Sequence, residues 1–99
     1  MSRAIKRPLL DLELIARVQG SLDAAVEHIG PHDAADYWDR RRAGLAALSR
    51  TLETWVQARI TQQGDACRVR IGGVSSTCTS GLEGGVRNWL TAARRKVAA

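Results

Sequence analysis

The chain has 99 residues, 44% of them hydrophobic, and carries 15 Lys and Arg against 10 Asp and Glu, a formal net charge of +5. This length supports one domain with a modest core, which we expect over residues 8–99, after a flexible basic tail over residues 1–7. No apolar run approaches the roughly 18 residues that a membrane helix needs, and no signal-peptide pattern opens the chain, so we expect a cytoplasmic protein. Two cysteines are too few for a disulfide scaffold and agree with a reducing compartment.

Acidic and basic residues are separated along the chain. Residues 11–39 contain seven acids and one base, whereas residues 40–99 contain eleven bases and three acids. This separation is typical of a protein with one face for phosphate or acidic protein. It is equally typical of two halves that neutralise each other across a helix interface, and the pattern alone does not decide between the two.

A first helix is predicted to begin near Pro8, which suits the first helical position, and to run to Ile29. Apolar residues recur at three- and four-residue steps throughout this stretch. Gly30 suits the left-handed position that ends a helix. Gly20 interrupts the pattern, so a kink or a break into two shorter helices remains open.

A second and longer helix is predicted over residues 33–63, with Asp33 as its N-cap and Gly64 after its end. Uninterrupted, it would form a rod of roughly 45 Å, which is longer than a small domain requires. Such a rod either protrudes or has a partner along it, and a homodimer through this helix is one possibility. Arg41 and Arg59 fall at seam positions of that dimer and count against it, and Gly44 is the point at which a bend would fall.

A β-hairpin is predicted from Cys67 to Cys78. Apolar residues alternate with arginine over residues 67–71, and Gly72-Gly73 suits a two-residue turn with both residues at positive φ. This turn places Cys67 opposite Cys78, so we expect two neighbouring thiols that are reduced in the cell and can join under strong oxidant. The polar face of the hairpin then carries Arg68, Arg70, Ser75 and Thr77. A single strand bulged at the glycines is the alternative.

A capped, basic helix is predicted to follow, because Ser80 and Glu83 have the spacing of a capping box. Its apolar stripe consists of Leu82, Val86, Trp89, Leu90, Ala93 and Val97. The expected fold class is therefore α+β and mainly helical, with the order α-α-β-β-α. All three tryptophans, Trp38, Trp55 and Trp89, fall on apolar helical positions and are expected in the core.

No catalytic arrangement is evident in the sequence. The four possible zinc ligands, His28, His32, Cys67 and Cys78, match no standard zinc-site spacing. No third residue is placed to orient a Cys–His pair, and the glycines of the hairpin do not belong to a phosphate-loop pattern. We therefore expect a protein that is not an enzyme and that uses no metal or cofactor.

The expected binding surface is basic and is formed by the hairpin together with the last helix. Its residues are Arg68, Arg70, Arg87, Arg94, Arg95 and Lys96. The run Arg40–Arg42 is a weaker candidate, because Asp36 and Asp39 lie within helical reach of it. Arginine-rich surfaces serve phosphate backbones and protein interfaces alike, so the partner is a host protein or ribonucleoprotein, or nucleic acid.

The C-terminal third, RVRIGGVSSTCTSGLEGGVRNWLTAARRK, resembles the closing segment of short phage and prophage proteins. The resemblance covers about thirty residues, mainly the Gly-Gly strand, the Thr-Ser-Gly-Leu cap and the Arg-Asn-Trp helix, and it transfers no functional residue. It implies a small accessory protein of a mobile element, a class that includes anti-CRISPR inhibitors. We expect a protein that binds and inhibits or modulates a host nucleoprotein complex. The alternative is a phage regulator that binds nucleic acid directly and tolerates different sequences.

Overall fold

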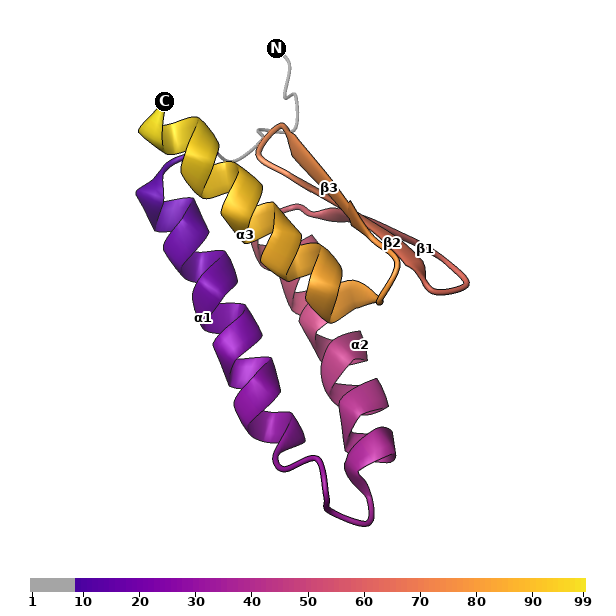
Figure 1. The fold of residues 1–99 in the computed structure, drawn as a ribbon. Helices are drawn as coiled ribbons and strands as arrows, with labels where there is room; N and C mark the ends of the chain where they lie inside the picture. The colour runs from indigo at the N-terminus through magenta and orange to yellow at the C-terminus, as the bar shows by residue number, and fades with distance from the viewer. Residues whose placement is uncertain (1–8) are drawn as a thin grey trace.

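The computed structural model describes residues 9–99, which form three helices and one antiparallel sheet (Figure 1). The helices are α1 (Leu12–Ile29), α2 (Tyr37–Trp55) and α3 (Leu82–Ala98), and the strands are β1 (Arg59–Gln63), β2 (Ala66–Ile71) and β3 (Val74–Cys78). Strand β2 lies in the centre of the sheet, between β1 and β3. The predicted α+β, mainly helical fold is confirmed, with one more strand than expected. Pro8 and the predicted tail lie outside the described residues.

The helices cover one face of the sheet only. Helix α3 packs on β2 and β3, and α1 runs beside α3 and contacts α2 along its length (Figure 1). The end of the α1–α2 pair that carries their connection extends beyond the sheet. The opposite face of the sheet therefore faces away from the helices. Among residues 9–99, no helix is long and apolar enough to span a membrane.

The core is centred on Trp89 of α3, whose side chain is fully buried. Its indole nitrogen donates hydrogen bonds to the carbonyl oxygens of Ile71 and Val74, both at 3.1 Å. These two residues oppose each other at the turn between β2 and β3. The contact therefore attaches the turn of the hairpin to α3 and leaves no polar group of the indole unpaired.

The predicted hairpin register is confirmed at every position. Ile71 opposes Val74 next to the turn, and Cys67 opposes Cys78 at the other end. Gly72 and Gly73 have φ values of 58° and 82°, the left-handed region that a two-residue turn of this kind requires. The alternative of one strand bulged at the glycines is therefore excluded.

The prediction of a helix over residues 33–63 is wrong at both ends. Residues 31–36 form successive turns instead of helix, and α2 begins at Tyr37 after Asp36, with Asp33 left outside. Helix α2 ends at Trp55, and residues 59–63 form β1, because pairing with β2 supplies backbone hydrogen bonds and outweighs helix propensity. A helix of 19 residues is about 28 Å long, so the length that suggested a homodimer is absent.

The predicted starts of the other two helices also differ from the structure. Helix α1 begins at Leu12, and the carboxylate of Asp11 caps it by accepting a hydrogen bond from the Leu14 N–H at 2.9 Å. The predicted capping box of α3 does not form, since the N-cap is Gly81 and no side chain caps this helix. The Ser80 hydroxyl is hydrogen-bonded to the Cys78 sulfur instead, at 2.8 Å.

Two glycines inside the helices have different surroundings. Helix α1 is continuous through Gly20, and a Cβ atom there would meet nothing within 4 Å. Gly44 does not bend α2 into two helices but lies against α1, where a Cβ atom would stand 2.8 Å from Cγ1 of the buried Ile29. Gly44 thus permits the close approach of the two helices, while Gly30 ends α1 at a φ of 78°, as predicted.

We expect Gly20→Ala and Gly44→Ala to change the free energy of unfolding in opposite directions. Alanine at position 20 should raise it by about 0.5–1 kcal/mol, the gain in helix propensity. Alanine at position 44 should lower it, because overpacking against Ile29 costs about 1–3 kcal/mol and exceeds that gain. Urea denaturation of both variants measures the difference, and equal stabilisation of the two would contradict the packing described here.

Candidate functional site

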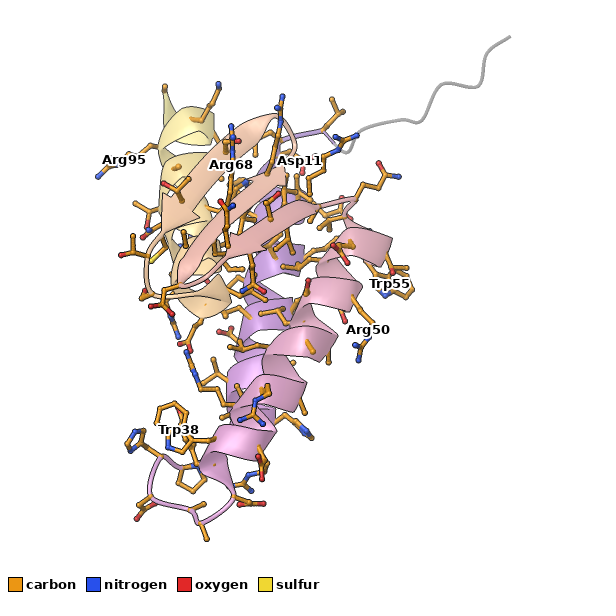
Figure 2. All side chains as sticks on the ribbon, turned by 90° about the vertical axis from the view of Figure 1, so that its right-hand side faces the viewer. Asp11, Trp38, Arg50, Trp55, Arg68 and Arg95 are labelled. Carbon is orange, nitrogen blue, oxygen red and sulfur yellow. The ribbon has the colours of Figure 1, made fainter. Side chains whose placement is uncertain are left out.

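The face of the sheet that points away from the helices is exposed and basic (Figure 2). We call it the outer face, and its residues are Arg59, Thr61, Gln63, Ala66, Arg68, Arg70, Ser75 and Thr77. The register places Arg59 opposite Arg70 on neighbouring strands, and Arg68 lies two residues along β2 on the same face. Alternation along the strands explains this segregation, since Ile60, Val69 and other residues between them point inward.

The three arginines of the outer face are not neutralised within the described residues. The ion pairs of residues 9–99 all involve other cations, and no carboxylate reaches Arg59, Arg68 or Arg70. Like charges directly opposite each other destabilise an antiparallel pair, and Arg59 and Arg70 stand in this relation. A ligand with several negative charges would remove this repulsion, so the outer face is suited to bind a polyanion.

Sequence reasoning missed Arg59, because it assigned this residue to the second helix. The signal that could have found it is the alternation of Arg59, Ile60 and Thr61, followed by Gly64 at a turn. Gly64 has a φ of 62° and separates β1 from β2. Reading the glycine as a hairpin turn, in place of a helix end, would have added this arginine to the predicted surface.

The predicted basic residues of α3 do not join the outer face. Arg87 is paired with Glu83 at 2.9 Å, and the guanidinium of Arg94 donates a hydrogen bond to Gln19 of α1 at 2.7 Å. Arg95 projects from α3 to the side of the sheet (Figure 2), and Lys96 beside it is exposed. The six predicted residues therefore divide into Arg68 and Arg70 on the outer face and a separate basic side of α3.

The run Arg40–Arg42 makes the pairs that were predicted for it and one more. Arg40 lies 3.4 Å from Asp36, and Arg42 lies 3.1 Å from Asp39. Arg41 reaches across to α3, where its guanidinium donates to Glu83 at 2.8 Å, and both side chains are only 24% exposed. The hydrogen bond from Arg41, followed by that from Arg87, lowers the pKa of the Glu83 carboxyl, and this network connects α2 with α3.

Two of the three tryptophans are not in the core, contrary to the prediction. Trp38 is 63% exposed and Trp55 is 72% exposed, because α2 buries only a narrow stripe of its surface. Trp38 contacts Tyr37 and His32, with ring centroids 5.1 and 5.9 Å away, at the end of the helix pair far from the sheet (Figure 2). Trp55 borders an apolar groove of about 700 Å³ between α1 and α2.

The possible metal ligands are dispersed over the fold. Cys67 and Cys78 are free thiols that oppose each other in the sheet, while His28 belongs to α1 and His32 to the aromatic contact with Trp38. Within residues 9–99, no group of three or more His, Cys, Asp or Glu side chains is close enough together to hold a metal ion. The outer face therefore offers the clearest site for a ligand.

No family model, no curated protein and no solved structure matches this chain. The resemblance to phage and prophage accessory proteins stays a prediction.

We expect Glu83→Gln to lower the free energy of unfolding by about 1 kcal/mol at pH 7, since it weakens charged hydrogen bonds to two arginines. Because the pKa of Glu83 is lowered, this stabilisation is complete above the ordinary value of 4.5 and is lost as the pH falls through the folded-state pKa. The free energies of unfolding of the variant and the unaltered protein should thus become similar in acid. Glu13→Gln, which removes an exposed ion pair with Arg17, is the control and should have little effect.

Proposed function

We propose that this protein binds duplex nucleic acid through the outer face of its sheet. The observation that supports this function is the group of three exposed arginines, Arg59, Arg68 and Arg70, with no carboxylate partner among the described residues. Arginine binds phosphate through a planar, permanently charged group with several donors. The formal net charge of +5 also favours anionic ligands over cationic ones.

The dimensions and composition of the outer face favour a duplex over a single strand. Three strands spaced about 4.8 Å apart have their outer axes about 10 Å apart, which is comparable with the roughly 12 Å between the phosphate backbones that border the major groove, so arginines of the outer face can reach phosphates there. The hydroxyl groups of Thr61, Ser75 and Thr77 are further donors to phosphate beside the arginines. Single-strand binders stack bases on aromatic rings, and the outer face has no aromatic residue.

Contacts of this kind fix the position of a protein on nucleic acid without reading its sequence. We therefore propose a binder that tolerates different sequences, whose affinity depends strongly on salt because bound phosphates release their counterions. The basic side of α3 lies apart from the outer face and is not required for this contact.

The double variant Arg68→Gln/Arg70→Gln should bind a duplex of about 20 base pairs more weakly. The slope of log K against log salt concentration should also become less steep by about 2, one for each lost phosphate contact. Arg94→Gln/Arg95→Gln loses the same charge from α3 and is the matched control. Fluorescence anisotropy at several salt concentrations measures both. Equal weakening of the two variants would indicate attraction to overall charge, and absence of binding by the unaltered protein at low salt would refute the proposal.

A second candidate function is binding to a protein of a host nucleoprotein complex, with inhibition or modulation of that complex as the outcome. The aromatic group of partly buried Tyr37 with exposed Trp38 and His32 favours it, because tryptophan and tyrosine are enriched at the centres of protein interfaces. This group lies far from the outer face, so one chain could contact protein at one end and nucleic acid at the other (Figure 2). Binding to a host nucleoprotein complex is also what the resemblance of the C-terminal third to phage accessory proteins, a class that includes anti-CRISPR inhibitors, implies.

Pull-down from host lysate with and without nuclease tests the second candidate. We expect a captured protein that remains after nuclease treatment, that is lost with Trp38→Ala and that is kept with Trp55→Ala. Trp55 is the control because it is equally large and similarly exposed on the same helix. Capture of nucleic acid alone would refute the second candidate and leave the first.

A further inference from the structure

The two thiols lie at matching positions of an antiparallel strand pair. Cys67 on β2 is directly opposite Cys78 on β3, and both therefore point to the same face of the sheet. Directly opposed residues have Cα atoms about 4.5–5.5 Å apart, which lies within the range of about 4.4–6.8 Å found for disulfides. The spacing expected for the two Cα atoms is thus compatible with a disulfide between the side chains.

Helix α3 packs closely on the thiols, which is possible because it presents two glycines to them. A Cβ atom at Gly84 would stand 2.5 Å from the sulfur of Cys78, and one at Gly85 would stand 3.4 Å from the sulfur of Cys67. Both sulfur atoms consequently lie under consecutive residues of the same helical turn, which places them close to each other. Any larger residue at position 84 would displace the sulfur of Cys78.

The two thiols differ in accessibility and acidity. Cys78 is partly exposed, and its sulfur is hydrogen-bonded to the hydroxyl of Ser80 at 2.8 Å and to the Ser80 N–H at 3.4 Å. These hydrogen bonds, the one to the hydroxyl first, lower the pKa of the Cys78 thiol. Cys67 is 2% exposed, and burial raises the pKa of its thiol. Cys78 is therefore the more accessible and more acidic thiol, and Cys67 is the protected one.

We propose that Cys78 and Cys67 form a thiol–disulfide exchange site that reduces small-molecule disulfides such as glutathione disulfide. The Cys78 thiolate attacks one sulfur of the small disulfide, forms a mixed disulfide and releases one thiolate. Cys67 then attacks the Cys78 sulfur and forms the Cys67–Cys78 bond, and its proton passes to the second thiolate, which is expelled. Two electrons pass from the protein to the small disulfide, and two small thiols are produced.

This proposal is independent of nucleic-acid binding, because both sulfur atoms are on the face of the sheet opposite to the arginines. The new bond would connect the open end of the hairpin whose turn Trp89 already holds. It would also free the hydrogen-bonding groups of Ser80, which lies just before the uncapped start of α3.

The test is incubation of the native protein with glutathione disulfide, followed by thiol counting and intact mass measurement. The unaltered chain should lose both thiols, retain no glutathione and form no disulfide between chains. Cys67→Ser should stop at a stable adduct of one glutathione on Cys78. Cys78→Ser should react about tenfold or more slowly, since the remaining thiol is buried.

Three results would overturn the proposal. They are a stable glutathione adduct on the unaltered chain, a disulfide between two chains, and reaction of Cys78→Ser at the rate of Cys67→Ser. Ser80→Ala gives a further measurement that does not remove a thiol. It should slow the first step, because the Cys78 thiolate loses a hydrogen-bond donor, and an unchanged rate would count against the role assigned to Cys78.

Discussion

The buried indole of Trp89 is the contact on which the position of the sheet depends. It fills the space between α3 and the hairpin, and its nitrogen binds the two carbonyl oxygens at the turn, where the strands have no further residues to pair. Because the indole approaches from the helical side, it commits the inner face of β2 to the core. The arginines at the alternating positions of β2 are thereby directed to solvent, and the basic outer face is a geometric consequence of how the tryptophan is packed.

Local signals predicted the C-terminal half well and the middle of the chain poorly. The hairpin register followed from Gly72-Gly73, because a two-residue turn determines which residues oppose each other. The strand β1 was missed because its local signal, a short alternation before Gly64, is weak and its residues were assigned to the preceding helix, whereas pairing with β2 is what holds them in a strand. Burial of Trp38 and Trp55 was wrongly inferred from helical position, since α2 has too few neighbours to cover these rings.

The candidate site could be predicted only in part, because local alternation reveals some of its residues and contacts between distant segments determine the others. Arg68 and Arg70 were placed on an exposed face from alternation alone, whereas Arg59 depended on the missed strand. The separation of the α3 cations from that face depends on which side of the helix packs on the sheet, and this is a property of tertiary structure. The acidic and basic halves of the chain neutralise each other only to a small extent. Within residues 9–99, the ion pairs between the two halves are those of Arg40 with Asp36 and of Arg42 with Asp39. The outer face keeps its charge.

The short sequence distance between Trp89 and the turn that it contacts also bears on how the chain folds. Its two hydrogen bonds join residues 18 and 15 positions apart, whereas the contact of Arg94 with Gln19 of α1 spans 75 positions. Closing a short loop costs less chain entropy than closing a long one, and contacts between near neighbours form faster. We therefore expect the hairpin and α3 to assemble first, as a nucleus, and α1 to dock on it late. On this order, the part of the outer face that belongs to β2 and β3 takes shape before the molecule is complete.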